Sequence, residues 1–186
     1  MITIAHRINT IEELRKTPTE YGVEIDIRAD YSGLYLNHEL FTSGDRLEDF
    51  LKEYHHGLLI LDIKEERVEF EVLRLLEKYN ITNYFFLDCS FPMINWLVNH
   101  GERKVALRFS EYESVDTLCL MRNKCDWVWV DTFTRNPLDE VTYNVIKTLG
   151  YKICFVSPEL QGQPEKKEEY LSQISKFDIE AICTDV

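Results

Sequence analysis

Short apolar runs alternate along the chain with longer stretches in which apolar residues recur at helical spacing. The runs are only a few residues long and are rich in β-branched and aromatic side chains, as buried β-strands are. We therefore predict eight strands, at about residues 2–6, 22–28, 57–63, 83–88, 104–109, 127–131, 152–156 and 180–184.

The stretches between these runs have the pattern of amphipathic helices. The clearest covers 66–79, where apolar side chains recur about every 3.6 residues. Further helices are predicted at 44–56, 91–99, 111–123, 137–149 and 165–176, and the connection 7–21 has room for one of about two turns. Pro137 is typical of a helix start, and Gly101 and Gly150 follow helical stretches as C-terminal glycines do.

Eight strands that alternate with helices indicate either a closed (β/α)8 barrel or a doubly wound open sheet. A typical barrel has about 250 residues, and the 186 residues of this chain have room for eight units without decoration. We predict an α/β fold, a compact (β/α)8 TIM-type barrel, as a single domain over 1–186. The open sheet is the alternative, and pairing of the last strand with the first distinguishes the two.

Composition narrows the class of partner. The chain has 33 acidic and 21 basic residues and a formal net charge of −12, which argues against nucleic-acid binding because phosphate backbones need a basic surface. No apolar run approaches the roughly 18–20 residues of a membrane span, and the N-terminus lacks the pattern of a signal peptide. Five cysteines without CxxC spacing indicate free thiols, so we expect a cytoplasmic protein.

Ionisable residues concentrate at the ends of the first three predicted strands: His6 and Arg7, Glu24 and Asp26, and Asp62 and Lys64. Residues two apart in a strand share a face, and the carboxyl ends of parallel barrel strands meet on one rim, where active sites form. Three carboxylates gathered there repel one another unless a cation joins them. All-oxygen ligation suits Mg²⁺ or Ca²⁺.

This combination predicts phosphodiester chemistry. His6 and His38, the latter in the loop after the second strand, are able to serve as general acid and base near neutral pH. A divalent cation together with Arg7 and Lys64 would neutralise a phosphate. The chain has neither a glycine-rich phosphate loop nor a G-x-S-x-G motif, which argues against P-loop enzymes and serine hydrolases. Taken singly, each residue also has a structural reading; Lys64, for example, could simply pair with Asp62.

The same residues resemble the motifs of the glycerophosphodiester phosphodiesterase family, TIM barrels of the phosphatidylinositol-phospholipase-C-like superfamily. IAHRIN, GVEIDIR, NHE and LLILDIK follow the order of the family's His-Arg-Gly, Glu-x-Asp, His-Asp and Glu-x-Lys motifs over residues 4–64, and the terminal Thr184-Asp185 looks like its Thr-Asp. The resemblance implies a metal-dependent hydrolase of small-molecule phosphodiesters. It assigns catalysis to His6 and His38, phosphate binding to Arg7 and Lys64, and the metal to Glu24, Asp26 and Asp62.

Several positions depart from the family pattern. Ile8 stands where the family has glycine, Glu39 where it has aspartate, and Asp62 where it has glutamate. The family's insertion after the second strand has no counterpart, so we expect an open site. A catalytically silent barrel that binds a phosphorylated ligand or a partner protein therefore stays as the alternative. Arg108, at a later strand end, is expected either to contact phosphate or sugar or to form a salt bridge with Asp88 or Asp131.

Overall fold

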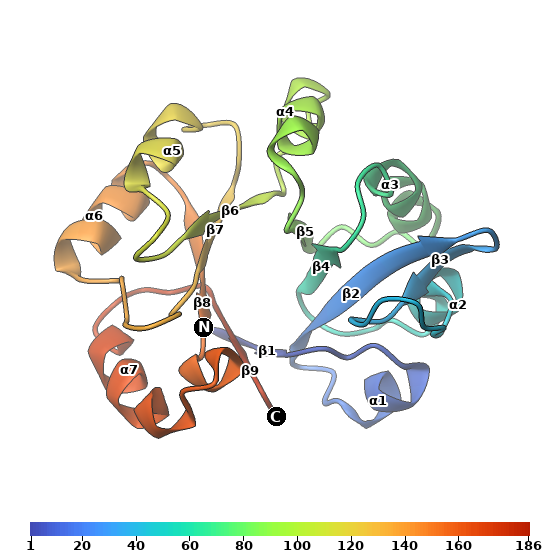
Figure 1. The fold of residues 1–186 in the computed structure, drawn as a ribbon, viewed down its shortest axis with the longest axis horizontal. Coiled ribbons are helices and arrows are strands. Elements are labelled where there is room, and N and C mark those ends of the chain that lie inside the picture. The colour runs from blue at the N-terminus through green and yellow to red at the C-terminus, as the bar shows by residue number, and fades with distance from the viewer.

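Eight parallel strands encircle the centre of the molecule, and helices surround them (Figure 1). The computed structural model describes all residues, 1–186. The strands are β1 (Ile2–Ala5), β2 (Gly22–Asp30), β4 (Leu59–Ile63), β5 (Tyr84–Leu87), β6 (Ala106–Phe109), β7 (Trp127–Val130), β8 (Lys152–Val156) and β9 (Ala181–Thr184), with β3 (Gly33–Leu36) outside the ring. Their order is β5-β4-β2-β1-β9-β8-β7-β6.

The pairing of the first and last strands confirms the barrel over the open sheet. β1 and β9 run parallel, with Ile2 opposite Ala181 and Ala5 opposite Thr184. The ring is weakest between β5 and β6, where a single bridge joins Phe86 to Val105. Neighbouring contacts there include a 2.8 Å hydrogen bond from Phe86 N to Lys104 O. The barrel is therefore nearly closed, with one loose seam.

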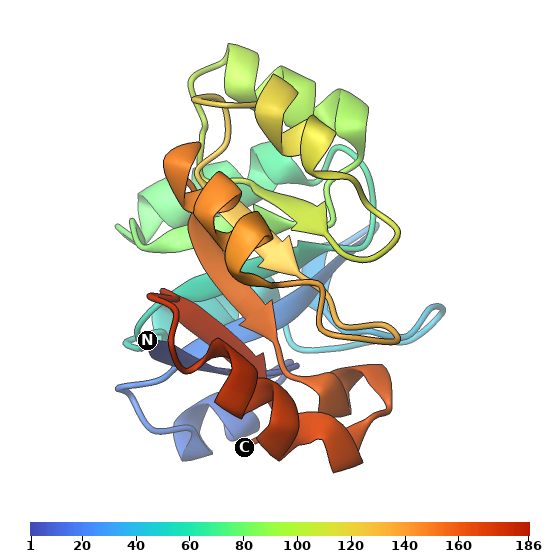
Figure 2. The same cartoon turned by 90° about the vertical axis from the view of Figure 1, so that its left-hand side faces the viewer.

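Helices follow the strands as the sequence pattern predicts. They are α1 (Ile11–Lys16), α2 (Leu47–Lys52), α3 (Glu69–Lys78), α4 (Phe91–Asn99), α5 (Val115–Leu120), α6 (Glu140–Thr148) and α7 (Lys167–Ile174), with 3-10 turns η1 (Pro158–Gln161) and η2 (Pro164–Lys166). Turned by 90°, Figure 2 shows α6 in orange and α7 in red in front of the tilted strands of that side. No helix has the length and apolar character needed to cross a bilayer.

The helix boundaries agree with some of the start and stop signals in the sequence. Gly101 and Gly150 have φ of 90° and 89°, the left-handed backbone expected of C-terminal glycines. The start predicted at Pro137 is wrong, because α6 begins at Glu140. Asp139 caps it: its Oδ1 accepts a 2.8 Å hydrogen bond from Thr142 N, which satisfies a donor of the first turn.

The strand β3 differs from the sequence-based prediction of a loop after the second strand. It pairs antiparallel with the far half of β2, from Ile27 opposite Leu36 to Asp30 opposite Gly33. A local signal for this hairpin exists in Asp-Tyr-Ser-Gly, where Asp30 Oδ1 accepts a 2.7 Å hydrogen bond from Ser32 N. The hairpin returns the chain to the barrel, so that His38 lies two residues beyond β3.

Alternation along the strands sorts side chains between two apolar layers. One layer lies between strands and helices, and a smaller one fills the barrel interior; the latter includes Ile60, Phe85, Trp127 and Trp129. On β4, Asp62 has the same parity as Ile60 and therefore also faces the interior. The interior thus changes from apolar to acidic toward the carboxyl ends of the strands.

Candidate active site

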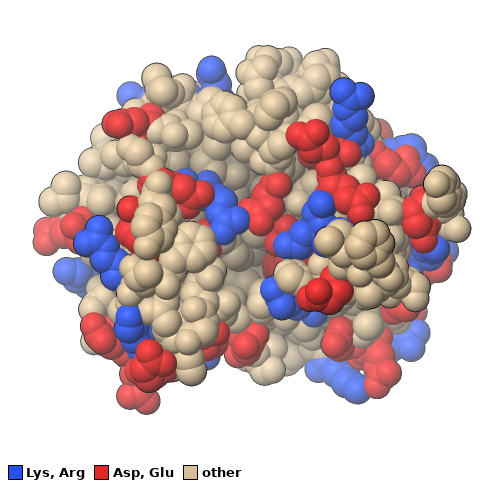
Figure 3. Space-filling model, in the orientation of Figure 1, with Lys and Arg blue, Asp and Glu red and all other residues tan.

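The face of the barrel drawn in Figure 3 is hollowed near its centre, and acidic and basic side chains gather around the hollow. Three buried acidic residues belong to neighbouring strands, Glu24 and Asp26 to β2 and Asp62 to β4, with exposed fractions of 2%, 1% and 7%. Asp26 lies directly opposite Asp62 in the β2–β4 register. One carboxylate oxygen from each of the three residues lies within 4.8 Å of the others.

The electrostatics of this acidic triad disfavour three bare carboxylates and are compatible with a bound cation. Burial, followed by repulsion from Asp26 and Asp62, raises the pKa of Glu24 well above its usual value. Burial, followed by repulsion from Asp88, raises the pKa of Asp62 to about 6, with Lys64 opposing the rise. Asp62 Oδ1 is buried and has no hydrogen-bond partner. Clustered buried carboxylates with a partnerless oxygen fit a divalent cation that takes oxygen ligands.

Lys64 supplies the one ammonium group inside the triad. Its Nζ lies 2.7 Å from Asp62 Oδ2 and 3.0 Å from Asp26 Oδ1. Lys64 therefore does form the salt bridge to Asp62 that the sequence left open as its structural role. Lys64 is thus the one ammonium among three carboxyl groups, and Asp62 Oδ1 is left without a partner.

The turn after β1 orients the carboxylates of β2. Arg7 N donates a 2.7 Å hydrogen bond to Glu24 Oε2, and Ile8 N donates one of 2.9 Å to Glu24 O. Asn9 forms a reciprocal pair with Asp26: its Nδ2 donates to Asp26 Oδ2 at 2.7 Å, and its Oδ1 accepts from Asp26 N at 2.8 Å. The positive φ of this turn, 55°, falls on Arg7, so Ile8 takes the place of the family's glycine without adopting a left-handed backbone.

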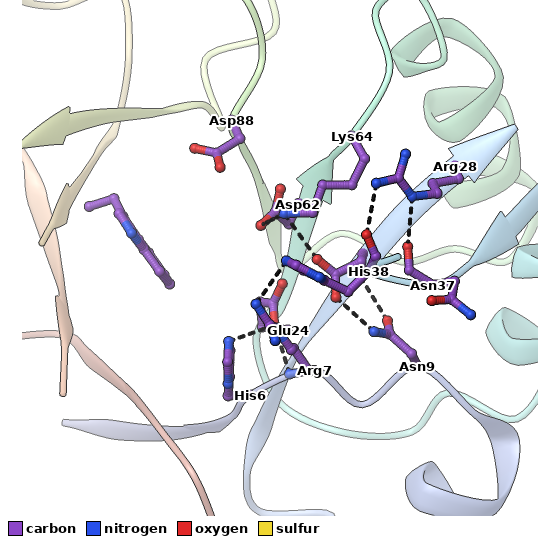
Figure 4. Close-up of polar contacts among 12 residues, drawn as sticks. His6, Arg7, Asn9, Glu24, Arg28, Asn37, His38, Asp62, Lys64 and Asp88 are labelled. Carbon is purple, nitrogen blue, oxygen red and sulfur yellow. Dashed lines mark hydrogen bonds and ion pairs between the residues drawn. The ribbon is translucent and has the colours of Figure 1, made fainter. Parts of the chain in front are cut away.

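The two histidines flank the triad (Figure 4), and each also has a carboxylate partner outside it. His6 Nδ1 lies 3.1 Å from Asp185 Oδ1, and its Nε2 lies 4.0 Å from Glu24 Oε2. Burial lowers the pKa of His6, while the Asp185 contact opposes that change.

His38 is held through both ring nitrogens. Its Nε2 lies 2.8 Å from Arg7 Nη2, and its Nδ1 lies 2.8 Å from Glu39 Oε1. A guanidinium only donates, so Nε2 accepts and the proton sits on Nδ1, directed at Glu39. Glu39 therefore makes, from the family's aspartate position, a carboxylate contact with the imidazole.

The structure brings all seven predicted site residues to one rim: His6, Arg7, Glu24, Asp26, His38, Asp62 and Lys64 (Figure 4). Sequence reasoning missed Asn9, although an amide two residues after the His-Arg pair is able to satisfy both a carboxylate and a backbone N–H. It also missed the contact between Asp185 and His6, which lie 179 positions apart.

Arg108 forms the salt bridges that the sequence left as one of two options. Its guanidinium pairs with Asp88 and, at 2.7 Å, with Asp131, while Glu113 Oε1 lies 3.6 Å away. Burial raises the pKa of Asp131 to about 6, with Arg108 opposing the rise. Beside this group lies a cavity of about 530 Å³, lined among others by Asp88, Phe91, Arg108 and Tyr112.

Comparison with known proteins gives a match in three dimensions only. No family model matches the sequence, and no curated protein matches it. A glycerophosphodiester phosphodiesterase from Agrobacterium tumefaciens str. C58 has a TM-score of 0.69 at 13% identity, over 98% of this chain and 96% of that one. A glycerophosphoryl diester phosphodiesterase from Parabacteroides distasonis ATCC 8503 has a TM-score of 0.66 at 14% identity, over 97% and 81%. This chain therefore has the (β/α)8 barrel fold of the glycerophosphodiester phosphodiesterases.

Proposed function

We propose that this protein is a metal-dependent phosphodiester hydrolase that resembles the glycerophosphodiester phosphodiesterases. The observation that carries the proposal is the acidic triad, with its partnerless Asp62 Oδ1, set between two histidines on the active-site rim of a barrel. The fold likeness supports the reaction class.

In this proposal Glu24, Asp26 and Asp62 hold the cation, and Mg²⁺ and Ca²⁺ are the candidates because all three ligands are carboxylate oxygens. The bound cation would neutralise phosphoryl oxygens and stabilise the charge that develops on them. Arg7 and Lys64 add two fixed positive groups at the same rim, and both are able to donate to phosphoryl oxygens.

The histidines divide the proton transfers between them. One takes a proton from the nucleophile, which is either a neighbouring hydroxyl group of the substrate or a water molecule. The other donates a proton to the departing alkoxide. With a neighbouring hydroxyl, its oxygen bonds to phosphorus as the alcohol leaves, and water then opens the resulting cyclic phosphate with the proton roles reversed. His38 has an unprotonated Nε2, which accepts a hydrogen bond from Arg7, and this is the tautomer that a base at Nε2 requires.

The substrate is a small phosphodiester, and the site has room for one larger than glycerol derivatives. Between His38 and β4 the chain forms only a loop and the six-residue α2, so no large inserted element is available to cover this side of the rim. The 530 Å³ cavity beside Asp88 offers space for the alcohol portion. A phosphodiester of a surface glycan or its precursor fits such an open site.

Net charge and free cysteines support a small-molecule substrate and a cytoplasmic location for this activity. The net charge of −12 favours a small molecule over a nucleic acid as the partner. All five cysteines are free, which is consistent with a cytoplasmic location.

The experiment is a screen of phosphodiesters, from bis-nitrophenyl phosphate to glycerophosphodiesters and nucleotide sugars, with Mg²⁺, Ca²⁺ and Mn²⁺ in turn. We expect turnover that a chelator abolishes and that the Asp26→Asn variant lacks. Equal turnover with and without divalent ions would contradict the metal-dependent reaction.

One observation favours the second candidate, a silent barrel that binds a phosphorylated ligand or a partner protein. Lys64 Nζ already contacts both Asp26 and Asp62, and Asp62 is one methylene shorter than the family's glutamate. In that case the screen would detect phosphate-ester binding by calorimetry without any turnover.

A further inference from the structure

Arg28 is a buried arginine outside the set of residues assigned so far. It belongs to the far half of β2, opposite Tyr35 of β3, and only 6% of it is exposed. Its Nε donates to Asn37 O at 3.1 Å and its Nη2 donates to His38 O at 2.7 Å (Figure 4). One guanidinium therefore holds two successive peptide carbonyls on either side of the His38 Cα.

The segment that Arg28 holds has no regular structure of its own. β3 ends at Leu36, and the chain remains outside helix and strand until α2 begins at Leu47. Asn37 N still donates to Asp26 O at 3.1 Å, which continues the pairing with β2. His38 O has Arg28 as its partner, so the main chain at the histidine is held through this side chain.

The burial of Arg28 requires these contacts. A guanidinium removed from water is costly unless its donors are satisfied, and the nearest carboxylate, Glu65 Oε1, lies 3.6 Å from Nη1. The two carbonyls accept its two side-chain hydrogen bonds, from Nε and from Nη2. A planar fork of donors is able to bridge two carbonyls at once, whereas the single ammonium of lysine is not equivalent.

We propose that Arg28 is a positioning residue for His38, which it fixes through the main chain so that Nε2 faces Arg7 and the site. The imidazole makes two contacts at 2.8 Å, Nε2 with Arg7 and Nδ1 with Glu39, and both depend on where the His38 backbone lies. The consequence for turnover rests on the proposed function, while the consequence for the ring does not.

The first test reads the ring directly, without any substrate. Nitrogen-15 NMR at about pH 8, where most histidines are neutral, reports which ring nitrogen of His38 carries the proton. We expect one Nδ1–H tautomer in the native protein and a mixture of tautomers in Arg28→Met. An unchanged single tautomer in Arg28→Met would overturn the proposal.

The second test is a double-mutant cycle with His38→Ala. We expect Arg28→Met to lower kcat roughly 10–100-fold, since a misplacement of about 1 Å is enough for such a loss, with KM changed less than about twofold. In the His38→Ala background the same substitution changes kcat less than about twofold, because the positioned group is gone. A full loss in both backgrounds would show that Arg28 acts on the fold or the metal site instead.

Two variants keep these tests decisive. Arg46→Met is the matched control, because the Arg46 side chain, at the far end of the same loop, also contacts a hairpin carbonyl, Gly33 O, and pairs with Asp30, with no contact to Asn37 or His38; it is expected to leave tautomer and kcat unchanged. If Arg28→Met does not fold, the His38 tautomer is measured in Arg28→Lys. We expect a mixture of tautomers there, and a single Nδ1–H tautomer as in the native protein would contradict the proposal. If the native protein turns over no phosphodiester, the proposed function fails, and the tautomer measurement still decides the role of Arg28.

Discussion

At the residue scale, the arrangement separates proton-handling side chains from cation-holding ones. His6 and His38 each have one ring nitrogen against a carboxylate outside the acidic triad, Asp185 and Glu39 respectively. The triad's own hydrogen bonds come from Lys64, Asn9 and the Arg7 backbone instead, and His6 Nε2 approaches Glu24 Oε2 only to 4.0 Å. Substitutions in the two sets should therefore have different effects on metal binding and on rate.

Replacing either histidine tests this separation. We expect His6→Ala and His38→Ala each to lower the rate on a cleaved phosphodiester roughly 10²–10⁴-fold, the usual range for lost acid–base catalysis. Metal affinity, measured by calorimetry, should stay near the native value. By contrast, Glu24→Gln should abolish metal binding and activity together. Native rates in both histidine variants would show that the histidines are structural.

At the element scale, the β5–β6 seam is held by side chains more than by main chain. A single bridge links these strands, and above it Arg108 of β6 joins Asp88, which follows β5, to Asp131, which follows β7. Asp131 also accepts hydrogen bonds from Trp129 Nε1 at 3.2 Å and Gln161 Nε2 at 3.0 Å. The cluster connects the ends of three neighbouring strands.

Removing the arginine should weaken the barrel. We expect Arg108→Met to lower the free energy of unfolding by about 3–5 kcal/mol, because it leaves the fully buried Asp131 without its charged partner. Arg103→Met is the control: Arg103 pairs with Asp126 at the surface, where a salt bridge contributes about 0–1 kcal/mol. Urea unfolding measures both, and equal losses would count against a special role for the seam cluster.

The raised pKa of Asp131 also predicts a pH dependence. Its folded-state pKa of about 6 exceeds the ordinary value, so the unfolded chain ionises first as pH rises. Below about pH 4 the ionisation of Asp131 adds nothing to the pH dependence of stability; between about pH 4 and 6 it lowers stability, by on the order of 3 kcal/mol, and the loss persists above that range. Urea unfolding of native protein and Asp131→Asn across this range should show a steeper decline for the native chain, and parallel curves would refute the assignment.

At the scale of the whole molecule, the acidic triad is built from strands β2 and β4 that come together only on folding. A cation that binds the folded state alone raises its stability by mass action, about 2.7 kcal/mol at a concentration a hundredfold above Kd. We expect millimolar Mg²⁺, Ca²⁺ or Mn²⁺ to raise the midpoint temperature of the native protein but not of Asp26→Asn. An equal shift in both proteins, or none in the native one, would argue against the site.

Much of the barrel was predictable because its signals are local. Strand-forming runs and amphipathic stretches are short-range patterns, so all eight barrel strands and the helices between them could be located. The faces that carry the carboxylates were also predictable from local alternation. A spacing of two places Glu24 and Asp26 on one face of β2, and alternation along β4 separately directs Asp62 inward. The exception, β3, depends on a four-residue run that pairs with the extended end of β2.

The remaining features depended on contacts between distant segments. Sequence alone determined that carboxylate, histidine and basic side chains lie at or near strand ends, because residue type and alternation are properties of each segment. Only the tertiary structure decided that Arg108 is held in salt bridges, that Asn9 pairs with Asp26, and that Arg28 supports His38. The physical reason is that a side chain's partner depends on strand register and loop path, which many segments determine together.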